Sequence, residues 1–341
     1  MYKESSVAVV VPVYNEEGFI SEVLRTIPGF VDRVYVVDDR STDGTWKEIQ
    51  YYVAQRTQQP DEPEDAGCAA RADGTGAQDR IVPVRKEENT GVGGAIKTGY
   101  LLALDDGIDV TAVMAGDGQM DPDILDRIIE PVVQGDADYS KGNRLRNREY
   151  RESMSQWRLF GNSLLTFLTK ISSGYWKTMD PQNGYTAISK GALKALEVEE
   201  LYDDYGFAND LLVHLNVHNM VVADVPMPAL YGEENSHINY TSFIPGLSWV
   251  LLKDLFWRLK TKYLVLDFNP LALFYLSGTV ISILGTLGIG WSAYKKVAEN
   301  SPIFVPGTMS LLVFMLGSML LLFAMLFDMQ TNKHLEITGY H

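Results

Sequence analysis

The sequence predicts an α/β domain with a largely parallel sheet, joined at its C-terminal end to an amphipathic helix and two membrane helices. Over residues 1–240, short apolar runs alternate with helical patterns, which is typical of strands connected by helices. Two long uncharged stretches hold most of the hydrophobic residues near the C-terminal end. A basic and aromatic segment lies between these two regions.

The elements of the first domain alternate along the chain. Strands are expected at Val7–Val13, Val34–Asp38, Ile81–Val84 and Val110–Met114. Helices are expected at Glu16–Ile27, Thr45–Gln55, Gly93–Leu104 and Pro122–Val133. The last helix has a good start, because Asp121 can cap it and proline suits its first position. Residues 56–80, rich in Pro, Gly, Ala and acids, are expected to be a disordered surface insertion that holds the single cysteine, Cys68.

Two uncharged stretches, Phe268–Trp291 and Ile303–Phe327, each exceed the roughly 20 residues that a helix needs to cross a membrane. Glycine, serine and threonine recur in the first stretch, and such small residues let membrane helices pack closely. The polar segment Ser292–Pro302 separates the two, so a helical hairpin is predicted. A pair of buried core helices is the alternative, but core helices of this length normally carry a polar face.

The segment Phe243–Leu266 precedes the hairpin and has apolar residues at helical spacing, together with several aromatic residues. Its basic residues are Lys253, Arg258, Lys260 and Lys262. This combination is typical of a helix that lies in the membrane interface. Because basic residues beside a membrane helix favour the cytoplasmic side, we expect a multi-pass protein of the cell membrane with residues 1–267 in the cytoplasm. The N-terminal residues lack the pattern of a cleaved signal peptide.

The expected organisation is therefore an α/β domain followed by four shorter segments. The α/β domain covers 1–240, the interfacial helix 241–267, the membrane helices 268–291 and 303–327, and the tail 328–341.

The composition excludes several function classes. The chain has 44 acidic and 29 basic residues and a formal net charge of −15, which argues against a protein that binds nucleic acid through its overall charge. Its single cysteine excludes a disulfide framework and a four-cysteine zinc site.

Polar loops follow the four predicted strands, and ligands of open α/β sheets bind at such carboxyl ends. The loops are Val11–Glu17 (VPVYNEE), Val36–Thr45 (VVDDRSTDGT), Asn89–Ala95 (NTGVGGA) and Met114–Pro122 (MAGDGQMDP). In the fourth loop, Asp117 and Gln119 can place two oxygens on Mg²⁺ or Mn²⁺, which would also accept the diphosphate of a nucleotide. Such triplets are also common in ordinary turns, so this loop taken alone favours a turn over a metal site.

The other loops, taken alone, also have structural explanations. The glycine-rich loop fits no dinucleotide fingerprint, because the sixth residue from Gly91 is Ile96, and it lacks the Gly-Lys-Ser/Thr of a P-loop. It supplies N–H groups at a helix start for an anion, although tight helix–strand packing is the simpler explanation of its glycines. Of Asp38 and Asp39, one can cap the following turn while the other accepts hydrogen bonds from a nucleobase or ribose.

In this order and spacing, the four loops resemble those of the family-2 glycosyltransferases with the GT-A fold. Within that family the chain is most similar to polyprenyl-phosphate sugar transferases of the dolichyl-phosphate mannose and glucose synthase type. The resemblance covers about residues 5–240, and the helical hairpin matches part of that group. It is greatest to archaeal enzymes that load a hexose onto dolichyl phosphate for N-glycosylation.

The resemblance implies roles for individual residues. The nucleotide would be bound by Pro12, Tyr14, Glu16, Val37, Asp39, Gly116 and Asp117. The divalent cation, Mg²⁺ or Mn²⁺, would be held by Asp117 and Gln119. The sugar and the acceptor would contact Gln182, Asn183 and Gly184. The residues that would carry catalysis are Asp117, Arg144, Arg158 and Asp210. Arg144 would lie near the reacting phosphates and Arg158 at the lipid phosphate, whereas capping or pairing is the alternative for Asp210.

The sequence departs from the family pattern at two places. The family often writes the metal loop as Asp-Ala-Asp-x-Gln, and Ala115 replaces the first aspartate, which leaves one carboxylate ligand fewer. Residues 231–237 lack the arginine and lysine that often follow the last strand. His214 and His218 are four residues apart, as a metal pair would be, but no His-Glu-x-x-His pattern accompanies them. His237 is a further candidate near the acceptor phosphate.

The function implied is transfer of a hexose from a nucleotide diphosphate sugar, with UDP-glucose or a related UDP-sugar favoured, to dolichyl or polyprenyl phosphate. A GDP-mannose-dependent synthase is the alternative, and a non-catalytic membrane scaffold that binds nucleotide sugars, supported by Ala115, is the alternative from another class. A processive polysaccharide synthase is disfavoured, because it requires a Gln-x-x-Arg-Trp element and more spans. The expected partners are the nucleotide sugar, the lipid phosphate and the bilayer, with no nucleic acid and with a homo-oligomer left open.

The net charge of −15 is then explained by the solvent around the protein and not by the substrate, which is itself anionic. Together with only 15 lysines in 341 residues, it leads to the hypothesis of a halophilic archaeal source.

Overall fold

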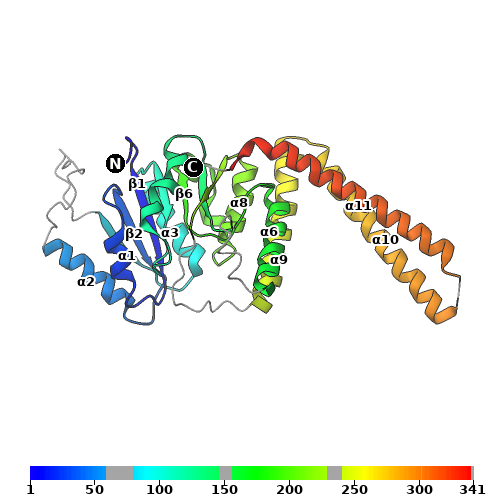
Figure 1. The fold of residues 1–341 in the computed structure, drawn as a ribbon, viewed down its shortest axis with the longest axis horizontal. Helices are drawn as coiled ribbons and strands as arrows, with labels where there is room; N and C mark the ends of the chain where they lie inside the picture. Colours follow the sequence, from blue (N-terminus) through cyan, green and yellow to red (C-terminus); the bar gives the residue numbers. More distant parts are fainter. Residues whose placement is uncertain (59–79, 146–155, 229–239, 301, 339–341) are drawn as a thin grey trace. The chain divides into compact units, whose positions relative to one another are not determined.

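The computed structural model describes residues 1–58, 80–145, 156–228, 240–300 and 302–338 (Figure 1). These residues form two compact units. The first holds Met1–Leu252 together with the C-terminal segment from Leu335, and the second holds Lys253–His334. The chain leaves the first unit within helix α9 (Tyr240–Lys260) and returns to it after the second unit is complete.

The first unit is built on a mixed sheet whose described strands follow the order β3-β2-β1-β4-β6-β5-β7-β8 (Figure 1). The strands are β1 (Val7–Val13), β2 (Arg33–Asp38), β3 (Ile81–Arg85), β4 (Val110–Val113), β5 (Tyr139–Asn143), β6 (Thr186–Ser189), β7 (Val222–Pro226) and β8 (Glu336–Thr338). Strand β6 runs antiparallel to its neighbours β4 and β5, and the other neighbouring strands pair in parallel. Strand β1 is a run of buried valines because parallel neighbours and helices cover it on all sides.

Helices cover both faces of this sheet. They are α1 (Ile20–Thr26), α2 (Thr45–Gln58), α3 (Gly91–Asp105), α4 (Leu125–Val133), α6 (Gln156–Ser173), α7 (Lys190–Ala195) and α8 (Phe207–Val217), with the 3₁₀ turns η2 (Pro122–Ile124) and η3 (Val198–Glu200). Successive residues of a strand point to opposite faces. Val7, Val9 and Val11 accordingly pack with α1, α2 and α4, whereas Ala8 and Val10 pack with α3, α7 and α8.

The expected strands lie within a residue or two of the observed ones, and two helix starts differ from expectation by three residues or more. Helix α1 begins at Ile20 rather than Glu16, because residues 16–19 form a turn closed by a hydrogen bond from Phe19 N to Glu16 O. The helix expected at Pro122–Val133 divides into η2 and α4, and the Asp121 carboxylate accepts a hydrogen bond from Asp123 N at 2.9 Å, as a cap should. The insertion expected at 56–80 is ordered at both ends, because helix α2 continues to Gln58 and Arg80 Nε donates to Val31 O at 3.1 Å. Residues 59–79, with Cys68, lie outside the described residues.

The second unit is a helical hairpin. A π-helix, η4 (Thr261–Leu266), leads to α10 (Leu271–Glu299) and α11 (Phe304–Asn332), and the 3₁₀ turn η5 (Lys333–Leu335) follows. The segments Leu271–Glu299 and Phe304–Leu335 are long and apolar enough to cross a membrane by length and composition. Small residues bring the two helices close, since a Cβ added at Gly285 would lie 2.4 Å from Phe314 N.

The turn between these helices is shorter than expected. Helix α10 continues through Ser292 to Glu299, so the polar loop expected at Ser292–Pro302 shrinks to a few residues. The residues after Trp291 are good helix formers, and Lys295 pairs with Glu299 one turn later at 3.5 Å. The helix ends at Asn300, whose backbone is left-handed (φ 49°). That residues 268–291 and 303–327 lie inside a membrane stays a prediction.

Candidate active site

The strand directions place the candidate residues at one edge of the sheet. Strands β1, β2, β3 and β4 are parallel, and β5 runs the same way as β4 because both are antiparallel to β6. Their carboxyl ends therefore meet at one edge. Strand β6 begins at this edge, so the segment that enters it, Asp180–Tyr185, also lies there. Ligands of open α/β sheets bind at such an edge.

Hydrogen bonds join the loops that follow β1 and β2. Asn15 N donates to Ser41 Oγ at 3.0 Å, and Thr42 N donates back to Asn15 Oδ1 at 2.8 Å. Glu16 N donates to Thr45 Oγ1 at 2.9 Å. These bonds hold Tyr14, which is 46% exposed, at the edge of the sheet. Pro12 is half-buried at the end of β1, and Val37 is fully buried in β2.

Asp39 is buried and fixed by the start of helix α3. Its Oδ1 accepts a hydrogen bond from Thr90 N at 3.0 Å, and its Oδ2 accepts one from Gly91 N at 2.7 Å. Lys86 Nζ lies 3.7 Å from Oδ1. The neighbouring Asp38 accepts from Ser41 N at 3.1 Å, which is the turn-capping role expected of one of the pair.

The glycines of the loop Asn89–Ala95 allow the backbone of another segment to pack closely against it. Gly94 N donates to Asp203 O at 2.9 Å, and a Cβ added at Gly93 would lie 2.5 Å from Tyr202 O. Further along α3, a Cβ at Gly99 would lie 2.3 Å from Val10 Cγ1. The glycines thus permit close packing on β1, as expected, and also on the segment that precedes α8.

The fourth loop forms a tight turn that presents Asp117. Gln119 N donates to Asp117 Oδ1 at 3.0 Å, and Gly118 occupies the left-handed region (φ 71°) that the turn requires. Burial raises the pKa of the Asp117 carboxyl, although the Gln119 N–H lowers it in part. Gly116 N donates to Pro12 O at 3.3 Å, which places the turn beside the end of β1.

Two ion pairs lie at the end of β5. Arg144 forms a bidentate pair with Asp180, with Nε–Oδ2 at 2.8 Å and Nη2–Oδ1 at 3.0 Å. The buried Lys141 donates from Nζ to Asp224 Oδ1 on β7 at 3.0 Å, and Asn143 Nδ2 donates to Asp224 Oδ2 at 2.8 Å. Burial alone would raise the pKa of the Asp180 carboxyl, but the Arg144 guanidinium holds it below its ordinary value.

The residues expected to face the sugar follow Asp180. Gln182 Nε2 is buried and has no hydrogen-bond partner among the residues that the structure describes. Asn183 Oδ1 accepts from Tyr185 N at 3.0 Å, which shapes the loop. Tyr185 Oη donates to Asp121 O at 2.9 Å, and a Cβ on Gly184 would lie 3.5 Å from Met120 Cε. The loop Asp180–Tyr185 therefore packs against the loop of Asp117.

The remaining predicted residues are placed differently. Asp210 is buried in α8, where Oδ2 accepts from Tyr202 N at 2.8 Å and Oδ1 lies 3.5 Å from His214 Nε2. These contacts match the pairing role that was its alternative. Arg158 belongs to α6, with its side chain outside the described part of the chain, as is His237. In the described ranges, no three His, Cys, Asp or Glu side chains, those of His214 and His218 included, come together to hold a metal ion.

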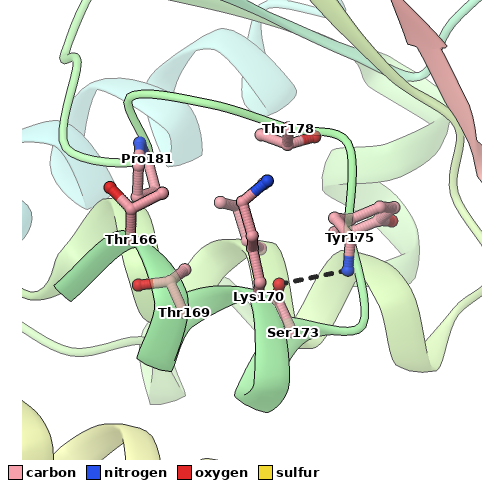
Figure 2. Close-up of a pocket in the computed structure, with 8 residues that line it drawn as sticks. Thr166, Thr169, Lys170, Ser173, Tyr175, Thr178 and Pro181 are labelled. Carbon is pink, nitrogen blue, oxygen red and sulfur yellow. Dashed lines mark hydrogen bonds between the residues drawn. The ribbon is translucent and has the colours of Figure 1, made fainter. Parts of the chain in front are cut away.

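Sequence reasoning missed two ionisable residues beside this site, the half-buried Lys170 and the buried Glu336. Lys170 lies on α6 in a small depression under the segment that leads to Asp180 (Figure 2). Its lining residues are Thr166, Thr169, Lys170, Ser173, Tyr175, Thr178, Pro181 and Leu212. Glu336 begins β8, which follows the helical hairpin. A charged residue shortly after an apolar stretch gives no sequence signal of a place in the sheet.

The comparisons with known proteins agree with this geometry. Residues 8–197 match the family model described as glycosyl transferase family 2, and this match covers more than half of the chain. The chain belongs to glycosyl transferase family 2. The match includes all four strand-end loops and the Arg144–Asp180 pair.

Several curated relatives of this family 2 glycosyltransferase come from archaea. The chain is 28% identical over 225 residues to a UDP-N-acetylglucosamine–dolichyl-phosphate N-acetylglucosaminyltransferase of Methanococcus voltae, covering 66% of this chain and 85% of that protein. It is 24% identical over 334 residues to the glycosyltransferase AglJ of Haloferax volcanii, covering 97% and 95%. It is 24% identical over 205 residues to a dolichol-phosphate mannosyltransferase of Pyrococcus furiosus, covering 57% and 49%.

Solved structures confirm the fold. A glucosyl-3-phosphoglycerate synthase from Mycobacterium tuberculosis, in complex with Mn²⁺, UDP and glucosyl-3-phosphoglycerate, matches 75% of this chain and 80% of its own. The TM-score is 0.50 and the sequence identity 17%. This family 2 glycosyltransferase therefore has the GT-A fold expected from its loops, and it is an enzyme.

Proposed function

We propose that this glycosyltransferase transfers a hexose from a nucleotide diphosphate sugar to dolichyl or polyprenyl phosphate, with UDP-glucose or a related UDP-sugar as the favoured donor. One observation carries the proposal: the 2.9 Å hydrogen bond from Tyr185 to Asp121 O joins the Asp117 turn to the Asp180–Tyr185 loop. The names of the relatives from M. voltae and P. furiosus support a lipid phosphate acceptor, and the former supports a UDP-linked donor. GDP-mannose is the alternative donor, supported by the mannosyltransferase relative.

The nucleotide would occupy the ends of β1 and β2. Tyr14 and Glu16 would line it from the first loop, and Pro12 and Gly116 would form its floor beside the Asp117 turn. Asp39 would accept a hydrogen bond from the base with the lone pairs that Thr90 and Gly91 leave, because a carboxylate has about four acceptor sites. The buried Val37 would fix the position of Asp39 from within β2.

A divalent cation fits the Asp117 turn. Burial raises the pKa of Asp117, and a cation beside the carboxylate would favour its ionised form. Mg²⁺ is usually held by one or two protein oxygens together with substrate phosphates, which agrees with a site built from Asp117 and Gln119. When bound, the cation would neutralise charge on the departing diphosphate.

The transfer itself needs positioning more than proton removal. A phosphate monoester is mostly dianionic at neutral pH, so its oxygen can attack the anomeric carbon without a general base. The bond from that carbon to the diphosphate oxygen breaks, and the nucleoside diphosphate leaves with the electron pair and inversion at the carbon. Arg144, held by Asp180, would stabilise the phosphate charge, and Arg158 would meet the lipid phosphate.

The sugar would lie against the Asp180–Tyr185 loop. Gln182, with its buried and unpartnered Nε2 within the described structure, would donate to a sugar hydroxyl, since a buried amide without a partner is costly. Asn183 and Gly184 would shape the pocket, and Asp210 would act on the sugar through the segment it holds at Tyr202.

We further propose that α10 and α11 anchor the enzyme as a multi-pass protein of the cell membrane. Trp249 and Phe256 on α9 are 70% and 55% exposed, as expected of an interfacial helix at 241–267. The basic residues of this segment favour the cytoplasmic side for the domain at 1–240.

Membranes that carry the full chain test the proposal. They are incubated with dolichyl phosphate and, in turn, radiolabelled UDP-glucose, UDP-N-acetylglucosamine and GDP-mannose. We expect label in extractable lipid with one donor, and its loss in Asp117→Ala. Asp105→Ala is the matched control, because Asp105 is exposed at the far end of α3. Nucleotide-sugar binding without lipid labelling for any donor would contradict the proposal and favour the scaffold.

A further inference from the structure

The segment that enters the sugar-facing loop is held by two buried carboxylates. We call residues Trp176–Met179 the strap. Glu336 accepts hydrogen bonds from Trp176 N at 3.0 Å, Lys177 N at 2.6 Å and Thr178 N at 2.9 Å. Asp224 on β7 accepts from Met179 N at 3.0 Å. Every backbone N–H of the strap thus points to a carboxylate, and hydrogen bonds to charged acceptors are the strong ones.

Lysines hold the first and last carbonyl groups of the strap. Lys170 Nζ donates to Trp176 O at 2.5 Å, and Lys141 Nζ donates to Met179 O. Figure 2 shows Lys170 on α6 pointing toward the part of the chain that carries Thr178. Alternating carboxylates and ammonium groups therefore fix both ends of the strap. Its last residue, Met179, is bonded directly to Asp180, the partner of Arg144.

Glu336 comes from the far end of the chain. Strand β8 pairs in parallel with β7, so that Glu336 lies opposite Val222 in register. Leu335 is 2% exposed within the core that includes α3, α7 and α8, and this anchors the strand. Glu336 itself is 7% exposed, and within the described residues the four hydrogen bonds to its carboxylate all come from the strap, the fourth from Thr178 Oγ1 at 3.3 Å. The chain reaches this strand only after α10 and α11.

We propose that Glu336 is a positioning residue for sugar transfer: its carboxylate fixes the strap and thereby places Asp180, Arg144 and the loop to Tyr185. The inference rests on the proposed function, because it assigns that loop to the sugar and acceptor. A displacement of about 1 Å in a reacting group can lower the rate about 100-fold, so a strap that has lost its hydrogen bonds to Glu336 would slow transfer. The loops of β1 and β2 are held by their own hydrogen bonds, so nucleotide binding is expected to be independent of Glu336.

The test uses the full chain in detergent micelles with the substitutions Glu336→Gln and Glu336→Asp. In the Glu336→Gln variant, an amide NH₂ replaces one carboxylate oxygen, and this donor repels the N–H groups of the strap. UDP binding by calorimetry counts the folded sites, and turnover is expressed per UDP site. We expect kcat per site to fall about 100-fold in Glu336→Gln, with the donor KM and UDP affinity within about twofold. Glu336→Asp keeps the charge and should lie between Glu336→Gln and wild type.

A second readout separates this inference from the proposed function. Hydrogen–deuterium exchange of the peptide that spans the strap is compared in wild type and variants, with Glu200→Gln as control because Glu200 is exposed on η3. Faster exchange of the strap amides in Glu336→Gln shows that Glu336 holds the strap, whether or not wild type labels lipid, so failure of the proposed transfer is distinguished from failure of the Glu336 contact. Unchanged exchange or wild-type kcat per site would each overturn the inference, as would loss of UDP binding together with turnover in a variant that still folds. If Glu336→Gln does not fold, Glu336→Asp decides by the same measurements.

Discussion

The guanidinium of Arg144 and the carboxylate of Asp180 form a bidentate ion pair across 36 residues of sequence. Arg144 follows β5, and Asp180 follows the strap with a left-handed backbone (φ 49°). The Arg144 backbone N–H also donates to Asp180 Oδ2 at 3.2 Å. Three hydrogen bonds to one carboxylate fix both the side chain and the backbone of the arginine. These bonds therefore link the end of β5 directly to the start of the Asp180–Tyr185 loop.

This pair predicts different effects for two substitutions of Arg144. Arg144→Ala removes the charge and should lower kcat about 100-fold, as expected for loss of a charge-stabilising group. Arg144→Lys keeps the charge but loses the bidentate geometry, so we expect a loss of about tenfold. Steady-state transfer assays measure both. Arg25→Ala is the control, because Arg25 forms an exposed pair with Glu22. Equal activity of Arg144→Ala and wild type would remove Arg144 from the reaction.

The same pair predicts a pH dependence of stability. Arg144 holds the folded-state pKa of Asp180 below the ordinary value of 3.8, although burial opposes it. The unfolded chain then binds more protons than the folded one in this range, so the stabilisation is full above 3.8 and is lost as the pH falls through the folded value. Asp180→Asn should be less stable than wild type at neutral pH, and the difference in melting temperature should shrink below that value. A constant difference from neutral to acid pH would contradict this account.

The sequence predicted the half of the sheet that follows local rules. Strands β1 to β4 are apolar runs between turn residues, so the sequence predicts that Asp39 and Asp117 follow their carboxyl ends, and this is where both residues lie. Strand β5 (YSKGN) is polar in sequence yet fully buried, because Lys141 is neutralised by Asp224 on β7. A strand that depends on a partner 83 residues away has no local signal.

The place of the C-terminal strand β8 in the sheet also has no local sequence signal. A three-residue strand such as β8 is too short for a periodic pattern, and its place beside β7 depends on pairing across more than 100 residues. The sequence places Glu336 only in the tail expected at 328–341. Its role in holding the strap became visible only from the hydrogen bonds to Trp176, Lys177 and Thr178.

Ala115 allows a gain-of-function prediction for the cation. Chelation by EDTA should abolish transfer, and Mn²⁺ or Mg²⁺ should restore it, if Asp117 and Gln119 hold a divalent ion. Ala115→Asp adds the carboxylate that the family often has, beside a half-buried Asp117. We expect the Mn²⁺ concentration for half-maximal activity to fall severalfold, because each added carboxylate raises affinity for a hard cation. Ala115→Asn is the control of similar size, and equal cation requirements for the two variants would contradict the assignment.

In the second unit, a fully buried ion pair joins α9 to α11. Arg258 contacts Asp328 through Nη1–Oδ1 at 3.0 Å and Nη2–Oδ2 at 2.9 Å, and both side chains are 0% exposed. Tyr263 Oη donates to Asp328 Oδ1 at 2.7 Å, and Asn332 Nδ2 donates to the same oxygen at 2.9 Å. The Asp328 carboxylate thus accepts hydrogen bonds from Arg258, Tyr263 and Asn332, and these bonds offset the cost of burying its charge.

This network predicts that breaking the pair is worse than removing it. Asp328→Leu leaves the Arg258 charge buried without its partner and should cost about 3–5 kcal/mol, whereas Arg258→Met with Asp328→Leu should recover most of that loss. Thermal unfolding in detergent micelles measures the single and double variants. The exposed pair Lys295–Glu299 serves as control, and its coupling should stay below about 1 kcal/mol. If the double variant is as unstable as Asp328→Leu alone, the cost lies in lost packing and not in the uncompensated charge, and the ion pair is not what joins α9 to α11.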